Sequence, residues 1–260
     1  MPAPEVPQNH MTLIVVPCYN EALRLDIDAF RTAAARDNQL HFLFTNDGST
    51  DGTLNKLRVL CAECPSLSIL HKPKNEGKAA AVRDGLLEGL RLDQYQFIGF
   101  WDADLATPLA AIDQLRNKML ANVDLQMVFG ARIRLLGREI HRKSIRHYLG
   151  RLFATCVSIM LKLPVYDTQC GAKIFKASPQ LTALLQRPFL TKWIFDVEII
   201  ARHMQQNGRV VTAQSIYEYP LHAWRDIGGS KVRPADFLRA LIDVLRIRKM
   251  YPLPKGSSTT

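Results

Sequence analysis

The sequence predicts an α/β fold with a mostly parallel, Rossmann-like sheet flanked by helices. Over the first 130 residues, short apolar segments alternate with amphipathic segments of helical period, and this alternation is typical of a parallel sheet covered on both faces. The chain has 260 residues, 47% of them hydrophobic, which is enough to enclose one large core. We therefore expect a single domain over residues 11–251, with a specialised second half because the alternation weakens after about residue 131.

The expected elements follow one another regularly along the first half. Residues 11–17 are continuously apolar and end in proline, which predicts a buried parallel strand. Residues 21–35 have helical spacing of apolar side chains, which predicts the first helix. The remaining strands are expected at 40–45, 66–71, 97–101 and 125–130, and the remaining helices at 54–64, 78–90 and 109–120.

The second half is expected to form a basic, amphipathic helical region. Within residues 237–250, one side of a helix would carry Leu238, Leu241, Ile242 and Leu245, while arginine and lysine provide charge elsewhere. Such a helix could lie in a membrane interface or pack its apolar side onto the domain.

The termini and the cysteines bear on location. Residues 1–10 lack the apolar core of a secretory signal, and we expect this segment and residues 252–260 to be disordered. No segment approaches the roughly 18–20 apolar residues of a membrane-spanning helix. The five cysteines are odd in number and scattered, as expected of reduced thiols. We therefore expect a protein on the cytosolic side of the membrane.

The charge distribution points to an anionic partner. The formal net charge is +10, which favours nucleic acid, an anionic membrane surface or phosphorylated substrates without choosing among them. Spacing of four residues would place Arg134, Arg138, Arg142 and Arg146 on one face of a helix. A solvated face is the alternative, but like charges would then repel, whereas phosphate oxygens match arginine forks. We expect this face to meet an acceptor phosphate or lipid headgroups.

An acid pair follows the apolar run 97–101. Asp102 and Asp104, separated by Ala103, would stand at the carboxyl end of a buried strand, where open α/β sheets bind ligands. Two carboxylates suit Mg²⁺ or Mn²⁺, which also bind substrate phosphates. Taken alone, the pair is weak evidence for a metal site, because acids in solvated loops often show the same spacing.

Three further turns lie where nucleotide contacts are expected. Residues 17–21 end the first strand, residues 46–53 end the second and include Asp47, and Lys78 begins a helix at 78–90. A lysine there conflicts with the helix dipole unless an anion lies nearby. Neither a P-loop nor a G-x-G-x-x-G segment occurs.

Together these motifs resemble family-2 nucleotide-sugar glycosyltransferases of the GT-A fold, and more narrowly the polyprenyl- and dolichyl-phosphate sugar transferases. The resemblance is carried, in order, by residues 16–21, 46–53, 75–78, 102–105, 130–132, 167–171, 193–198 and 229–231.

The resemblance implies roles for individual residues. The nucleotide-sugar contacts would be made by Pro17, Tyr19, Glu21, Asp47, Lys78, Asp102 and Ala103. The metal would be held by Asp102 and Asp104, and Arg132 would face a phosphate. Candidates for orienting the acceptor or closing the site are Asp167, Asp196 and Glu198, and Arg132 and Asp104 complete the catalytic set. The acceptor phosphate or headgroup would meet Arg132, Arg138, Arg142 and Arg146.

One position departs from the pattern. Dolichyl-phosphate mannose synthases often carry a glutamine as a further metal ligand two residues after the second acid, where this chain has Ala106. Segments 102–108, 167–171 and 195–198 look closer to dolichyl-phosphate glucosyltransferases, so glucose is favoured over mannose and a third protein ligand is in doubt.

The resulting hypothesis is an inverting, metal-dependent hexosyltransferase. It would use a UDP- or GDP-sugar and a polyprenyl or dolichyl phosphate, with the nucleotide bound by residues 11–130 and the acceptor by residues 131–251. A phosphate acceptor is already largely dianionic at neutral pH and needs no catalytic base. Membrane association would be peripheral, on the cytosolic face, or through a separate membrane subunit. The alternatives are a transferase acting on a soluble or polymeric sugar and a non-catalytic basic protein that binds nucleic acid or membranes; we expect no nucleic acid.

Overall fold

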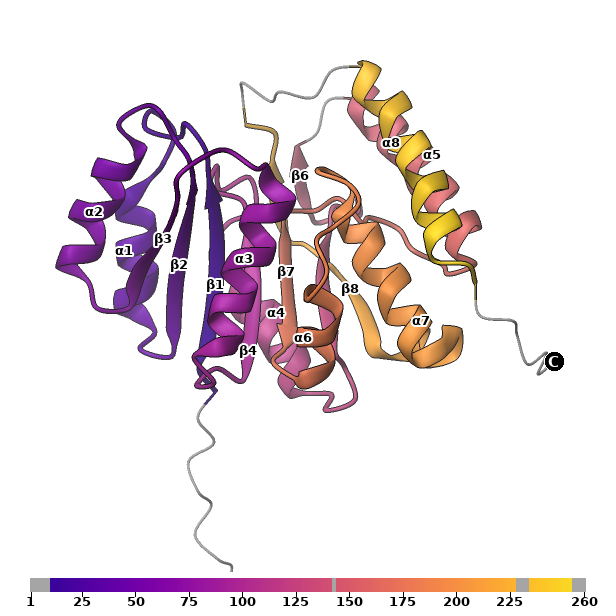
Figure 1. Cartoon of the computed structure of the whole chain (residues 1–260), viewed down its shortest axis with the longest axis horizontal. Helices are drawn as coiled ribbons and strands as arrows, with labels where there is room; N and C mark the ends of the chain where they lie inside the picture. Colours follow the sequence, from indigo (N-terminus) through magenta and orange to yellow (C-terminus); the bar gives the residue numbers. More distant parts are fainter. Residues whose placement is uncertain (1–9, 142–143, 228–233, 254–260) are drawn as a thin grey trace, which may run out of the picture.

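The computed structural model describes residues 10–141, 144–227 and 234–253, without the side chains of 144–147 and 234–238. Its centre is a seven-stranded sheet in the order β3-β2-β1-β4-β7-β5-β8 (Figure 1). The strands are β1 Thr12–Cys18, β2 Leu40–Asp47, β3 Leu67–Lys72, β4 Phe97–Trp101, β5 Met127–Ala131, β7 Ala172–Lys176 and β8 Ile216–Pro220. β7 runs antiparallel to both neighbours, while the other paired strands of the sheet are parallel. The prediction of a mostly parallel sheet is confirmed.

Helices cover both faces of this sheet. They are α1 Ile27–Arg36, α2 Thr53–Glu63, α3 Lys78–Arg91, α4 Ala111–Leu120, α5 Ser144–Leu161, α6 Pro179–Leu185, α7 Phe195–Ser215 and α8 Pro234–Met250. Alternate residues of β1 supply two separate cores, with Leu13 and Val15 on one face and Ile14 and Val16 on the other, because successive strand side chains point to opposite faces. A small second sheet pairs β6 (Glu139–His141) with β9 (Ala223–Arg225).

The predicted elements of the first half lie within a few residues of the observed ones, with one correction. The helix expected over 21–35 begins only at Ile27. The backbone before it is held by the next turn, because Glu21 N–H donates to Thr53 Oγ1 and Asn20 Oδ1 accepts from the amide of Thr50. Asp26 then caps the helix by accepting from the amide of Ala29.

The basic segment is also different from the prediction. Arg134 and Arg138 lie in the connection between β5 and β6 and not on a helix, so the expected four-residue arginine face does not form. This connection makes a turn at residues 136–137, where Arg138 N–H donates to Leu135 O, and then leads into β6, which pairs with β9. Arg142 lies outside the described residues, and Arg146 lies on α5 with its side chain outside the described set.

The C-terminal helix expected at 237–250 is confirmed as α8. Within the described residues, no helix is both long enough and apolar enough to cross a membrane. The segments predicted to be disordered, 1–10 and 252–260, lie outside the described residues except at His10, Pro252 and Leu253.

Candidate active site

The predicted site residues come from different strands that end at one edge of the sheet. β1, β2 and β4 are parallel and adjacent, so their carboxyl ends meet at this edge, where open α/β sheets bind ligands. The edge carries Tyr19 after β1, Asp47 at the end of β2 and Asp102 after β4. The topology therefore places these three residues at one edge of the sheet, and the nucleotide contacts predicted for them stay predictions.

The acid pair lies in a tight turn directly after β4. Asp102 N–H donates to Gly171 O of the neighbouring β7 end at 2.9 Å, and Leu105, with a positive φ of 54°, completes the turn. Asp104 Oδ1 accepts from the amide of Ala106 at 3.0 Å. Ala103 between them is buried. The pair is thus anchored by backbone contacts and does not belong to a loose, solvated loop.

Gly171 creates the space that the Asp102 carboxylate occupies. A Cβ on Gly171 would lie 1.9 Å from Asp102 Oδ2 and 2.1 Å from its Cγ. Such distances are far inside van der Waals contact. The glycine is therefore required for the observed position of Asp102.

Lys78 supplies a positive charge to the acid pair. Its Nζ lies 2.5 Å from Asp102 Oδ1, and both side chains are about one-third exposed, at 36% and 34%. Burial alone would lower the pKa of Lys78, but the charge and hydrogen bond of Asp102 raise it above the ordinary lysine value. The positive charge of Lys78 at the start of α3 is thus balanced by the carboxylate of Asp102.

The donor set is compatible with a divalent metal. Burial raises the pKa of Asp104 above its ordinary value, and the neighbouring charge of Asp102 raises it further. A divalent cation between the two would relieve this repulsion and favour both ionised forms. Among the described residues, no group of three or more histidine, cysteine or acidic side chains could hold a metal. Asp102 and Asp104 are therefore candidate ligands that suit a divalent cation, and the metal site itself stays a prediction.

Asp47 holds the loop that leads into α3. Its buried carboxylate accepts from the amides of Glu76 at 3.0 Å and Gly77 at 2.8 Å, and Lys72 Nζ lies 3.9 Å away. Because Gly77 directly precedes Lys78, this contact positions the lysine. The predicted contact of Asp47 with a base stays a prediction, and it would use the remaining lone pairs of the carboxylate.

The segment after β1 combines exposed and anchored side chains. Pro17 is half-buried at the end of the strand, and Tyr19 is 36% exposed. Glu21 is mostly buried and forms an ion pair with Arg24 at 2.6 Å. The ring of Tyr19 lies partly at the surface, and the nucleoside contact predicted for it stays a prediction.

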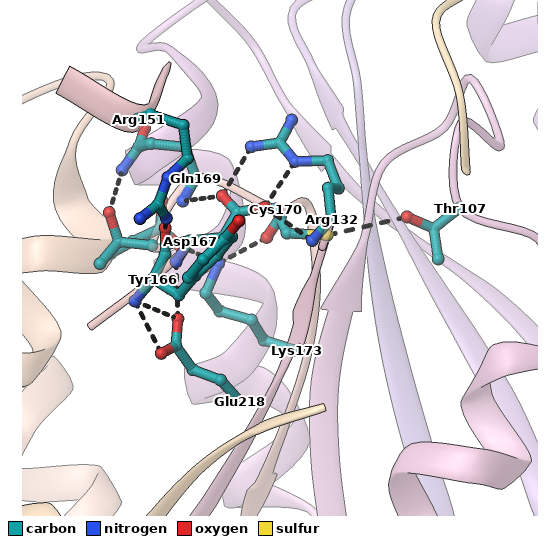
Figure 2. A network of polar contacts seen from close by, with 11 residues as sticks. Thr107, Arg132, Arg151, Tyr166, Asp167, Gln169, Cys170, Lys173 and Glu218 are labelled. Carbon is teal, nitrogen blue, oxygen red and sulfur yellow. Dashed lines mark hydrogen bonds and ion pairs between the residues drawn. The ribbon is translucent and has the colours of Figure 1, made fainter. Parts of the chain in front are cut away.

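A second network lies at the carboxyl end of β5 (Figure 2). Arg132 binds Asp167 through two parallel bonds of 2.7 Å, from Nε to Oδ2 and from Nη2 to Oδ1. The backbone amide of Arg132 also donates to Asp167. Glu218 on β8 accepts from the amides of Tyr166 and Asp167 at 2.7 and 2.6 Å. Arg132 is thus held rigidly, with part of its guanidinium already bonded.

Asp196 and Glu198 separate in the structure although they are two residues apart. Asp196, at the start of α7, is buried 2.7 Å from Lys173 Nζ, and its charge also acts on Lys78. Glu198 is fully buried and binds Arg202 at 2.7 Å and the amide of Leu190 at 2.8 Å. The structure therefore brings Asp196 toward the acid pair but places Glu198 in a network that holds neighbouring loops.

Sequence reasoning missed three residues that shape this edge. They are Gly171, which makes room for Asp102, Lys173, which pairs with Asp196, and Glu218, which holds the loop before Asp167. A lysine within the otherwise apolar run 172–175 was a signal for a buried charge pair. Glu218 lies in a short, aromatic strand and gave no comparable signal.

Comparison with known proteins identifies the family. Residues 13–178 match the family model Glycosyl transferase family 2. The chain belongs to this family. A dolichyl-phosphate beta-glucosyltransferase of Trichomonas vaginalis is 30% identical over 261 residues, which cover 95% of this chain and 74% of that protein. The dolichyl-phosphate beta-glucosyltransferase of Saccharomyces cerevisiae is 29% identical over 263 residues, covering 92% and 75%.

A similar fold is found among solved structures. Glucosyl-3-phosphoglycerate synthase from Mycobacterium tuberculosis, in complex with Mn²⁺, uridine diphosphate and glucosyl-3-phosphoglycerate, superposes with a TM-score of 0.66 at 17% identity. The superposition covers 95% of this chain and 82% of the synthase chain. It confirms the predicted GT-A fold. The protein is therefore a glycosyltransferase, and the alternative of a non-catalytic basic protein is set aside.

Proposed function

We propose that this enzyme transfers a hexose, glucose in preference to mannose, from a nucleotide-diphosphate sugar to a polyprenyl or dolichyl phosphate. The observation that carries the proposal is the anchored pair Asp102 and Asp104 with Lys78 at the carboxyl edge of the sheet. The names of the relatives at 29–30% identity, dolichyl-phosphate beta-glucosyltransferases, support the lipid acceptor and the choice of glucose.

Residues 11–130 would bind the donor. Tyr19 and Pro17 would contact the nucleoside, and Asp47 would accept a hydrogen bond from the base. Asp102 and Asp104 would hold Mg²⁺ or Mn²⁺, which when bound neutralises charge on a departing diphosphate. Lys78, released in part from Asp102, would add a second cation beside the same phosphates.

Residues 131–251 would bind the acceptor. The guanidinium of Arg132 has five N–H donors, of which Asp167 takes two. The remaining donors would orient an acceptor phosphate. Asp196, whose charge acts on Lys78, would close the acceptor site on that side. An acceptor phosphate oxygen would attack the anomeric carbon as the bond to the diphosphate breaks on the opposite face, which inverts that centre. The acceptor needs positioning more than deprotonation, since its phosphate is already largely dianionic.

We also propose that the enzyme works at the cytosolic face of a membrane, where a lipid acceptor resides, either peripherally or with a membrane subunit. The net charge of +10 supports association with an anionic surface.

The test is transfer from UDP-glucose and from GDP-mannose to a short polyprenyl phosphate with Mg²⁺ or Mn²⁺. We expect lipid-linked glucose, and loss of donor binding and transfer in Asp102→Asn and Asp104→Asn. Asp113→Asn is the matched control, because that carboxylate lies exposed on α4 and pairs only with nearby Arg116 among the contacts described. Donor hydrolysis without lipid product would instead favour a soluble or polymeric sugar acceptor.

A further inference from the structure

α5 is apolar on two sides, and only one of them faces the core. Phe153, Ala154, Val157 and Leu161 are buried against the domain. The side turned to solvent carries a second row of large apolar side chains at helical spacing, comprising Tyr148, Leu149, Leu152 and Ile159. Ile159 is 72% exposed and Leu152 is 54% exposed. A helix that packs one face on a core normally turns polar residues outward, so this row requires an explanation.

α8 extends the same apolar surface. It contacts α5, and the two helices run side by side beyond β8 (Figure 1). Ala240, Val244 and Ile247 are buried, whereas Leu245 is 67% exposed and Ile242 is 45% exposed. The sequence placed Leu238, Leu241, Ile242 and Leu245 on one side of this helix and left open whether that side packs on the domain or lies in a membrane interface. In the structure Ile242 and Leu245 point outward and Leu241 is half-buried, whereas the side chain of Leu238 lies outside the described set.

Basic side chains accompany this apolar surface. The segments that form α5 and α8 contain six arginine or lysine residues and two acidic residues. Arg239, Arg246 and Lys249 are exposed on α8. Large outward apolar side chains beside arginine and lysine are typical of helices that lie in the interface of an anionic bilayer.

We propose that the outward face of the α5–α8 pair, defined by Tyr148, Leu149, Leu152, Ile159, Ile242 and Leu245, docks onto an anionic lipid bilayer by inserting these side chains among the headgroups. The proposal depends on the proposed function in one respect: a lipid acceptor would have to be reached from the bilayer surface.

The placement of the two helices fits this occupant. Both begin on the side of the molecule to which the carboxyl end of β1 points (top in Figure 1), so docking would hold the candidate active site beside the headgroups. A second copy of the chain suits the face less well, because a two-fold pairing would bring the basic side chains of both copies together. An anionic bilayer neutralises them instead.

The experiment is co-flotation of the full chain with vesicles. Vesicles of phosphatidylcholine alone are compared with vesicles that contain phosphatidylglycerol, at low and high salt. We expect binding to the anionic vesicles that weakens with salt. The double variant Leu152→Asn/Leu245→Asn should bind about tenfold or more weakly, because two side chains no longer gain from burial. The matched control is Val123→Asn/Val210→Asn, which changes two exposed valines outside this face and should bind as the wild type does.

A second readout follows insertion directly. Leu245→Trp should show a blue-shifted emission on anionic vesicles, as an indole does when it leaves water. Equal binding of both double variants, or no binding by the wild type, would overturn the proposal. A dimer of the wild type that Leu152→Asn/Leu245→Asn dissociates would overturn it as well. Donor binding by the same samples tests the proposed function separately, since none of these side chains belongs to the candidate active site.

Discussion

The substitution Gly171→Ala should displace the Asp102 carboxylate while leaving the fold largely stable. The new Cβ would stand 1.9 Å from Asp102 Oδ2, 2.1 Å from Cγ and 2.5 Å from Oδ1. Real Cβ contacts stay beyond about 3 Å, so the carboxylate must move by about 1 Å or more. Because the obstructing atoms are the end of a rotatable side chain, the fold can accommodate the change while the carboxylate leaves its position.

The expected functional loss is much larger than the loss of stability. A displacement of about 1 Å at a reacting or binding group commonly costs about 100-fold, whereas overpacking of this kind costs about 1–3 kcal/mol. The ion pair with Lys78 is lost at the same time, since it uses the same carboxylate. We therefore expect Mn²⁺-dependent binding of UDP-glucose to weaken about 10- to 100-fold with a modest decrease in melting temperature.

Titration calorimetry with Mn²⁺ and UDP-glucose, together with thermal melting, measures both effects. Gly52→Ala is the matched control, because a Cβ there meets only Ala22 Cβ, at 3.8 Å, and the φ of Gly52 is −71°. Wild-type donor and metal affinity in Gly171→Ala would refute the reasoning, since Asp102 could then not be a ligand in the position described.

Two buried ion pairs lead to further predictions. Arg132→Met leaves Asp167 without its bidentate partner, and urea denaturation should show a loss of about 3–5 kcal/mol; a loss below about 1 kcal/mol would contradict the rigid arrangement. Burial raises the pKa of Asp196, and Lys173 opposes this rise, so Lys173→Met should raise that pKa further. Since the protonated acid is neutral, the destabilisation should be greatest near pH 8 and shrink as the pH falls toward 5, and Lys173→Met/Asp196→Asn should remove this pH dependence.

The parts of the fold that sequence reasoning predicted depend on local patterns. The five predicted strands and the helices between them could be recognised in the sequence, because apolar periodicity and turn composition are set by neighbouring residues. Asp102 and Asp104 could be placed at the ligand edge for the same reason, since an acid pair after a buried strand must lie at its carboxyl end.

The errors arose where distant segments decide the outcome. A spacing of four suggested a helix through Arg134 and Arg138, but that connection makes a turn at residues 136–137 and leads into β6, which pairs with β9 some 80 residues later. The start of α1 shifted because the turn that contains Thr53 binds the backbone of Glu21. Neither contact leaves a mark in the local sequence.

By itself, the sequence determined the alternating architecture, the acid pair at the sheet edge and the family resemblance, because each depends on short ordered motifs. Only the tertiary structure decided which side chains share that edge. Insertion of antiparallel β7 between β4 and β5 brings Gly171 against Asp102 and Lys173 against Asp196. The docking of α8 on α5 likewise leaves Ile242 and Leu245 outward. These contacts depend on packing between segments that are distant in the sequence, and composition and periodicity do not predict such packing.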